Sequence, residues 1–203
     1  MTVTRDMMIE MRHPHVFQGE THSSHRGVRT STYGAVVHSM SEIIKRPGMD
    51  IGCTDWIEGL GYSVHRYILP DGQVNVGLAD HLGAHHAGES MVELDDRDEW
   101  WLNKSTLGAE FVVAGTHDYS SFLTKIRGAP GEAYTDEQYF SGGYVYAGWG
   151  LEYGFGFEQI WPHSLVSGDL VRGPGKGKRD PGVAFDWMKF ENWFDRWTAK
   201  LKG

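Results

Sequence analysis

The sequence predicts an α/β fold in one domain, and three observations support this prediction. Short apolar runs with β-branched residues, typical of buried strands, are spread over the first part of the chain. Two helices are expected in the last third, where apolar residues recur every three or four positions. The chain has 203 residues, of which 40% are hydrophobic; this is enough for one well-buried core and short for two. We therefore expect an N-terminal arm of residues 1–29 and one folded domain over residues 30–203.

Composition excludes several classes of function. The formal net charge of −8 argues against a general nucleic-acid binder, because neutralising phosphates requires a basic surface. Cys53 is the one cysteine of the sequence, which excludes an internal disulfide and a cysteine-only zinc site. The first residues carry Asp6 and Glu10 and lack the apolar stretch of a secretory signal. No apolar run approaches the roughly 20 residues that span a bilayer, so we expect synthesis in the cytoplasm, no membrane and no obligate protein partner.

Four histidines lie in the expected N-terminal arm, at His13, His15, His22 and His25. The pair on either side of Pro14 could ligate a metal. Nothing periodic, however, fixes these side chains relative to one another. We therefore favour solvated histidines over a metal site in this arm.

The first strand is expected over residues 32–38, a short apolar run that ends at His38. This histidine is either packed in the core or presented as a ligand from the end of the strand, and residues further along the chain favour the ligand. Residues 41–60 then predict one or two short helices, broken at Pro47-Gly48.

A β-hairpin is expected next. Residues 62–69 have the pattern of a strand, Pro70-Asp71-Gly72 is strong turn chemistry, and residues 73–77 alternate as the returning strand. We expect His65, in the first of these strands, to be packed or to support a site rather than to be a ligand.

Two adjacent histidines occupy the loop Ala84-His85-His86-Ala87-Gly88. Neighbouring residues of an extended chain point in opposite directions. One of the two is therefore expected to line a cleft and the other to be solvated. The acidic residues 89–99 that follow predict a surface loop.

A third apolar strand is predicted over residues 106–113, and Glu110 interrupts it. A buried carboxylate is costly unless it is paired or lies near a metal. The alternative is an edge-strand glutamate that faces water. We favour a functional carboxylate, because burial beside charge is how acid–base groups are tuned.

Two helices follow from sequence signals in the last third. Thr135-Asp136-Glu137-Gln138 is a capping box, with Thr135 as the N-cap and Gln138 as its partner. The helix behind this box has one apolar face, formed by Phe140, Tyr144, Ala147 and Leu151. A C-terminal helix is predicted by an apolar stripe at Val183, Trp187, Phe190, Phe194, Trp197 and Leu201. The spacing of this stripe is typical of core packing and not of a cofactor site.

The segment from Trp161 to Trp187 carries the chemistry to which the other elements contribute. It contains His163, then a basic cluster, and then Asp180 just before a proline. That proline fixes its own φ and favours an extended Asp180. We expect His163 and Asp180 to hold a metal together with His38. The stretch GDLVRGPGKGK lacks the Lys-Ser/Thr of a phosphate-binding loop, and we expect a flexible, basic surface loop there.

Six motifs in this order resemble the zinc-dependent N-acetylmuramoyl-L-alanine amidases of type 2. That fold is shared by amidase-type phage lysins, cytosolic anhydromuramyl-peptide amidases and peptidoglycan recognition proteins. The motifs run over most of the chain and are similar to the family's first ligand strand, second-strand hairpin, "AWHAG" loop, "N…IGIE" segment, "TxEQ" helix start and "RKxDPG" corner. They are Val36-Val37-His38, Ser63-Val64-His65 with Asp71-Gly72, Ala84-His85-His86-Ala87-Gly88, Asn103 through Gly108-Ala109-Glu110, Thr135-Asp136-Glu137-Gln138 and Lys178-Arg179-Asp180-Pro181-Gly182.

The resemblance implies a single mixed central β-sheet flanked by helices, with residues 30–203 as the catalytic domain. It implies one Zn²⁺ as cofactor, with His38, His163 and Asp180 as its ligands. Glu110 would be the acid–base carboxylate and Lys178 the cation that faces the developing oxyanion.

Two positions depart from the family's pattern. His163 follows Trp161-Pro162 where the family usually has a glycine, and the loop from His163 to Asp180 is longer than usual. Val64 stands where some phage members carry a tyrosine in the site, so that group is absent here.

The implied reaction is hydrolysis of the amide between the lactyl group of N-acetylmuramic acid and L-alanine. Two histidines and one carboxylate leave a zinc position open for water, whose pKa the metal lowers. Proton transfer would fall to Glu110, and Lys178 would stabilise the oxyanion. Three aromatic residues, Tyr33, Trp100 and Trp101, are candidates for the floor of a saccharide–peptide groove, although structural packing explains them equally well.

The implied partner is peptidoglycan or a muropeptide, and more than one role remains open. The chain could be a phage endolysin that acts on the cell wall after release, or a cytosolic muropeptide-recycling amidase. A third alternative is a recognition module that binds peptidoglycan without cutting it. Asp180 favours hydrolysis, because a module that only binds does not require a complete set of metal ligands.

Overall fold

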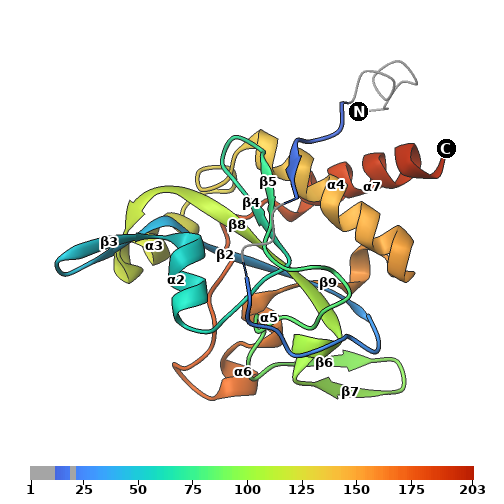
Figure 1. Cartoon of the computed structure of the whole chain (residues 1–203), viewed down its shortest axis with the longest axis horizontal. Coiled ribbons are helices and arrows are strands. Elements are labelled where there is room, and N and C mark those ends of the chain that lie inside the picture. Colours follow the sequence, from blue (N-terminus) through green and yellow to red (C-terminus); the bar gives the residue numbers. More distant parts are fainter. Residues whose placement is uncertain (1–11, 19–21) are drawn as a thin grey trace.

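The computed structural model of the chain describes residues 12–18 and 22–203 (Figure 1). The expected N-terminal arm is therefore described only in part. Asp6 and Glu10, on which the prediction about a secretory signal depends, lie outside the described residues.

A seven-stranded mixed β-sheet forms the centre of the fold, as expected. Its order is β1-β5-β4-β8-β2-β3, and β9 also pairs with β2. Strands β8 and β2 run parallel, as do β4 and β8, whereas the β4–β5 and β2–β3 pairs are antiparallel. The strands are β1 (Val16–Phe17), β2 (Gly34–Arg46), β3 (Met49–Gly52), β4 (Arg66–Ile68), β5 (Val74–Val76), β8 (Thr106–His117) and β9 (Ile160–Pro162).

Helices lie on both sides of this sheet, and a separate two-stranded sheet lies beside it. Two long helices, α4 and α7, pack against each other, and Figure 1 shows them together on one side of the molecule. The α-helices are α2 (Cys53–Gly59), α3 (Tyr119–Ile126), α4 (Asp136–Tyr153), α5 (His163–Val166), α6 (Asp169–Arg172) and α7 (Trp187–Lys202). Two 3₁₀ turns, η1 (Leu102–Lys104) and η2 (Phe157–Gln159), and the hairpin of β6 (Met91–Leu94) and β7 (Arg97–Trp100) complete the described elements.

The period of two along the central strands separates the core from the opposite face of the sheet. In β8, the odd-numbered residues from Leu107 to Val113 join the large cluster that includes Tyr146 of α4 and Phe190 of α7. Successive side chains of a strand point to opposite faces. Even-numbered residues such as Val112 accordingly belong to other clusters, on the face away from those two helices. His38 of β2 and Glu110 of β8 lie on that second face.

The four predicted strands are confirmed, with different limits. The strand expected over residues 32–38 is β2, which continues to Arg46, so His38 lies within the strand and not at its end. The strand over residues 106–113 is β8 and extends to His117. The predicted hairpin is formed by β4 and β5, although β4 covers only Arg66–Ile68 of the expected 62–69.

The prediction of short helices in residues 41–60 is wrong for most of that range. The chain stays extended to Arg46, turns at Pro47-Gly48, and returns as β3 antiparallel to β2. Gly48 has a φ of 84°, a backbone conformation open to glycine, so the dipeptide closes a hairpin and does not break a helix. Only α2, from Cys53 to Gly59, is helical.

The acidic residues 89–99 are not a plain surface loop. They contain β6 and the start of β7, which pair antiparallel from Met91↔Trp100 to Leu94↔Arg97. Val92 of this hairpin is buried against the cluster that contains Val36. Alternation of apolar and acidic residues is the pattern of a half-buried strand, and the high acidity obscured it.

Both predicted helices in the last third are confirmed. The capping box is present: the hydroxyl of Thr135 accepts from the backbone N–H of Gln138, and the Gln138 side chain accepts from the backbone N–H of Thr135. Helix α7 buries the centre of its apolar stripe, at Phe190, Phe194 and Trp197. Val183 precedes this helix and is 70% exposed, so it is not part of the stripe.

The N-terminal segment packs on the domain. The backbone N–H groups of His22 and Arg26 donate to the carbonyls of Gly77 and Gly83. The expectation that His22 is solvated is wrong: it is buried, with its Nε2 2.7 Å from the hydroxyl of Tyr67. Residues 22–29 therefore contribute to the same folded body as the sheet.

Within residues 12–18 and 22–203, none of the helices combines the length and the apolar character that crossing a bilayer would require.

Candidate metal centre

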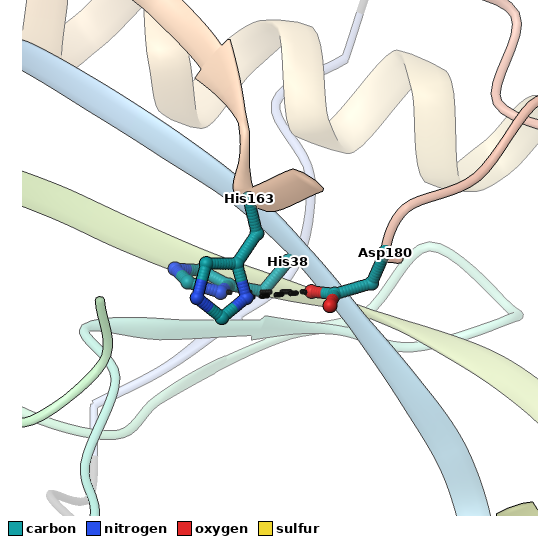
Figure 2. Close-up of side chains that lie close together, drawn as sticks. All are labelled: His38, His163 and Asp180. Carbon is teal, nitrogen blue, oxygen red and sulfur yellow. Dashed lines mark hydrogen bonds and ion pairs between the residues drawn. The ribbon is translucent and has the colours of Figure 1, made fainter. Parts of the chain in front are cut away.

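His38, His163 and Asp180 converge from three separate segments (Figure 2). His38 lies in β2, and His163 is the first residue of α5, directly after β9. Because β9 pairs in parallel with β2 at residues 35–37, the two histidines follow neighbouring strand segments. The backbone N–H of Ser164 donates to the carbonyl of Asp180 at 2.8 Å, which fixes the third segment beside α5.

The three side chains have the composition and spacing of a metal site. One ligand atom of each lies within 4.8 Å of the others. Oδ2 of Asp180 is 3.0 Å from Nδ1 of His163 and 3.7 Å from Nδ1 of His38. Nε2 of His163 is buried and has no hydrogen-bond partner. Two imidazoles and one carboxylate in a buried cluster form a donor set that zinc accepts, so the group could bind a metal ion.

Burial and neighbouring charges have opposite effects on the pKa of Asp180, whereas both lower the pKa of His38. Burial alone would raise the pKa of Asp180, but the charge of His163, its hydrogen bond and Lys178 outweigh that effect and lower it. Burial lowers the pKa of His38 far below its usual value, and His163 and His86 lower it further. A carboxylate beside a neutral imidazole is the protonation state in which both can act as metal ligands.

Glu110 lies on the same face of the sheet as His38. The two residues are register partners on the parallel strands β8 and β2. The alternative of an edge-strand glutamate is wrong, because β8 lies between β4 and β2 and Glu110 is 8% exposed. Its Oε2 is buried without a partner. Burial raises the pKa of Glu110 well above its usual value, and Asp180 raises it further, while Lys178 lowers it.

Lys178 borders the same pocket from the segment before Asp180. Its backbone N–H donates to the carbonyl of Ser167 at 2.9 Å. Asp169, in α6, holds the rest of this segment: one carboxylate oxygen accepts from the N–H of Gly177 and the other pairs with Arg179, both at 2.8 Å. The expected loop therefore contains the short helix α6, whose aspartate anchors the residues on either side of Lys178.

The three remaining histidines of the motifs have different surroundings. His65 is packed, as expected: its Nδ1 accepts from the N–H of Gly108, and its Nε2 lies 3.0 Å from the Leu82 carbonyl. His85 and His86 both border the pocket but contact different partners. Nε of Arg26 donates to His85, whereas the His86 ring contacts His38. No pattern in the sequence indicates that His86, rather than His85, contacts a candidate ligand.

A pocket of about 430 Å³ opens beside the metal centre. One part of its wall is apolar and includes residues from α2 and α3, and another part is basic. The apolar part includes Trp56, Ile57 and Leu60, and the basic part includes Arg172, Lys178 and Arg179. Tyr33, Trp100 and Trp101, the candidates for the floor of a saccharide–peptide groove, are not among the residues that line this pocket.

Comparisons with known proteins identify the fold. No protein-family model matches the sequence, and no curated protein matches it. Several solved structures do match. A selenomethionine derivative of AmpD is 22% identical, with a TM-score of 0.59, covering 90% of this chain and 95% of that one. The endolysin N-acetylmuramoyl-L-alanine amidase LysCS from Clostridium intestinale is 14% identical, with a TM-score of 0.57 and coverages of 91% and 97%.

A third match carries a ligand. AmpDh3 from Pseudomonas aeruginosa, in complex with an anhydromuramic pentapeptide, is 18% identical, with a TM-score of 0.56, covering 87% of this chain and 66% of that one. At such identities the likeness concerns the fold. This chain has the mixed central sheet flanked by helices that these structures share.

Proposed function

We propose that this protein hydrolyses the amide bond between N-acetylmuramic acid and L-alanine in peptidoglycan. The observation that carries the proposal is the convergence of His38, His163 and Asp180 next to a buried glutamate in one pocket. The fold gives independent support, since LysCS is an N-acetylmuramoyl-L-alanine amidase and AmpDh3 binds an anhydromuramic pentapeptide. We assign the catalytic domain to residues 30–203.

His38, His163 and Asp180 would hold one zinc ion. A zinc ion bound by three protein ligands supplies a Lewis acid that polarises the amide carbonyl and acidifies water. The chain's part is to present two neutral imidazoles and one carboxylate at the same point. The N–H of Ser39 donates to Oδ2 of Asp180 at 3.2 Å, which orients that carboxylate towards the histidines.

Glu110 would move the protons of the reaction. Its buried position and raised pKa allow it to accept a proton from the attacking water and then to donate one to the leaving amine. The unpartnered Oε2 leaves one carboxylate oxygen available for this transfer. No neighbouring tyrosine from position 64 can share the role, because that residue is Val64, a member of an apolar cluster.

Lys178 would stabilise the oxyanion of the tetrahedral intermediate. Lys178 lines the pocket from the same short segment that supplies Asp180. A preorganised positive charge near a developing oxyanion acts mainly on the transition state. The Asp169 contacts to Gly177 and Arg179 restrict the backbone that carries it.

The presence of Glu110 favours hydrolysis, and not simple binding of peptidoglycan, as the function. A recognition module that only binds peptidoglycan has no use for a buried carboxyl with an unpartnered oxygen, because such a group costs stability. The pocket also has room for water and substrate beside the three candidate ligands. Among hydrolytic roles, we propose a phage endolysin that acts on the cell wall, with a muropeptide-recycling amidase as the second candidate.

The decisive experiment is digestion of purified peptidoglycan by the zinc-loaded protein. We expect new amino termini on L-alanine and no new reducing sugars, because one carboxylate of the site, Asp180, is assigned to the metal and does not form the acid–base pair of a glycosidase with Glu110. Chelator-treated protein, and the same protein after zinc is restored, provide the control. Cut glycan strands with intact stem peptides would place the protein in another class. Parallel assays on intact walls and on soluble anhydromuropeptides distinguish the endolysin from the recycling enzyme.

A further inference from the structure

A series of close polar contacts runs from His38, in the candidate metal centre, to the backbone carbonyl of Leu102 in η1. Nε2 of His38 lies 2.8 Å from Nδ1 of His86. On the far side of the His86 ring, Nε2 lies 3.3 Å from the hydroxyl oxygen of Thr106. That hydroxyl lies 2.8 Å from the carbonyl oxygen of Leu102. The proposed metal chemistry uses none of these contacts beyond His38 itself.

The carbonyl of Leu102, the last group in this series of contacts, determines on which atom each proton lies. A carbonyl oxygen can only accept, so the Thr106 hydroxyl donates to Leu102. With its one proton committed, the Thr106 oxygen accepts from His86, which must therefore carry its proton on Nε2. Nδ1 of His86 is then a lone pair, and the proton between the two histidines belongs to Nε2 of His38.

This order leaves Nδ1 of His38 as the atom without a proton. That nitrogen is the one that faces Asp180, at 3.7 Å from Oδ2. A ring lone pair and a carboxylate oxygen that face each other repel unless a cation lies between them. We infer that His86, oriented by Thr106, is a positioning residue that holds His38 in the Nε2–H tautomer, with Nδ1 free to bind the metal. The inference rests on the proposed metal site.

The surroundings of His86 fix its ring in this position. The Asn103 side-chain oxygen accepts from three consecutive backbone N–H groups, those of His86, Ala87 and Gly88, at 2.8 to 3.2 Å. The ring also lies against Gly108, where a Cβ atom would come within 2.5 Å of Nδ1 of His86. Glycine at this position of β8 therefore makes room for the His86 ring. These contacts give the ring one orientation, which the hydrogen-bond order requires.

The test combines a tautomer measurement with zinc affinities. In metal-free protein labelled with ¹⁵N-histidine, long-range ¹H–¹⁵N correlation spectra should show His38 and His86 as Nε2–H tautomers. Zinc affinity, measured by competition with a chelator, should fall about 10- to 100-fold in His86→Leu, as is typical when a residue that orients a metal-bound histidine is lost. His86→Asn should recover much of the affinity, because its amide oxygen can accept from Nε2 of His38.

Thr106→Val and Thr106→Ser form the matched pair for the far end of this series of contacts. Thr106→Val removes the acceptor of His86 at nearly constant volume, and we expect a several-fold loss of zinc affinity. The loss should be smaller than in His86→Leu, because the His86 ring is still present opposite Nε2 of His38. Thr106→Ser keeps the hydroxyl and should bind zinc as the wild type does.

Two results would overturn the inference. One is an Nδ1–H tautomer of His38 in the metal-free protein. The other is an unchanged zinc affinity in a folded His86→Leu variant. Failure of the wild-type protein to bind zinc at all would instead overturn the proposed metal site, and the tautomer spectra would still decide the hydrogen-bond order by themselves.

Discussion

His38 and Glu110 are partners in the register of β2 and β8, two parallel strands at the centre of the sheet. Although 71 residues lie between them in the sequence, the pairing of β2 with β8 places them side by side. The side chains of register partners project from the same face of a sheet. The candidate metal ligand and the candidate proton carrier are therefore held side by side by two inner strands of the sheet. The opposite faces of both strands are occupied by the core with α4 and α7.

We expect Glu110→Gln to keep zinc and to lose turnover. Glutamine preserves the shape of the side chain but cannot accept the proton, and general acid–base groups contribute about 10²- to 10⁴-fold. The measurement is kcat on purified peptidoglycan, with zinc content determined on the same samples. Glu191→Gln, an exposed substitution in α7, is the control and should behave as the wild type. Wild-type turnover in Glu110→Gln would show that this carboxyl is structural.

The basic segment offers a matched pair of lysines. Lys178 borders the pocket, whereas Lys176, two residues earlier, does not. We expect Lys178→Met to lower kcat about 10²- to 10³-fold, the usual effect of removing one oxyanion donor. Lys176→Met should leave kcat unchanged. Both lysines are exposed, so folding should survive in both variants. Equal losses in the two would mean that the segment acts through its net charge.

Zinc content tests the ligand assignment directly. The wild type should hold about one zinc per chain, and a His38→Ala, Asp180→Ala double variant should hold none. His81→Ala, which removes an exposed histidine outside the pocket, should keep full occupancy. Chelation should leave the domain folded, as judged by circular dichroism, because the large core cluster does not include the candidate ligands. Full zinc content in the double variant would disprove the assignment.

Much of the fold follows from local signals. The strands β2 and β8 are continuous apolar runs because both of their faces are covered, and the capping box at Thr135 identifies the start of α4. The two errors in assigning secondary structure have one physical origin. At Pro47-Gly48 and within residues 89–99, the outcome depends on which strand or cluster lies opposite, and a single sequence does not contain that information. Pairing with β2 and burial of Val92 decided both cases.

The candidate site was predictable in part for a similar reason. Two features are unusual enough to be noticed without a structure. One is the occurrence of Lys178 two residues before Asp180, which itself precedes a proline. The other is a glutamate inside an apolar strand. The contact of His86 with His38 could not be noticed in this way. Two adjacent histidines give no indication of which ring contacts a residue 48 positions earlier in the sequence. Its partners, Thr106 and Gly108, look like ordinary strand residues in the sequence.

The last prediction concerns stability at acidic pH and uses His65. This ring is fully buried, accepts from the N–H of Gly108 and contacts the Leu82 carbonyl. Burial lowers its pKa well below 6.5, and His86 lowers it further. The unfolded chain thus binds a proton near pH 6.5 that the folded chain excludes, so the free energy of unfolding must fall as the pH drops below that value. Each such proton contributes about 1.4 kcal/mol per pH unit.

We expect His65→Gln to be less stable than the wild type at pH 7.5. Towards pH 5, however, its free energy of unfolding should fall less steeply than that of the wild type, by about the amount per pH unit that one proton contributes. Urea denaturation of the metal-free proteins measures this, with the exposed His81→Gln as control. Parallel curves for wild type and His65→Gln would contradict the assignment of a neutral, buried His65.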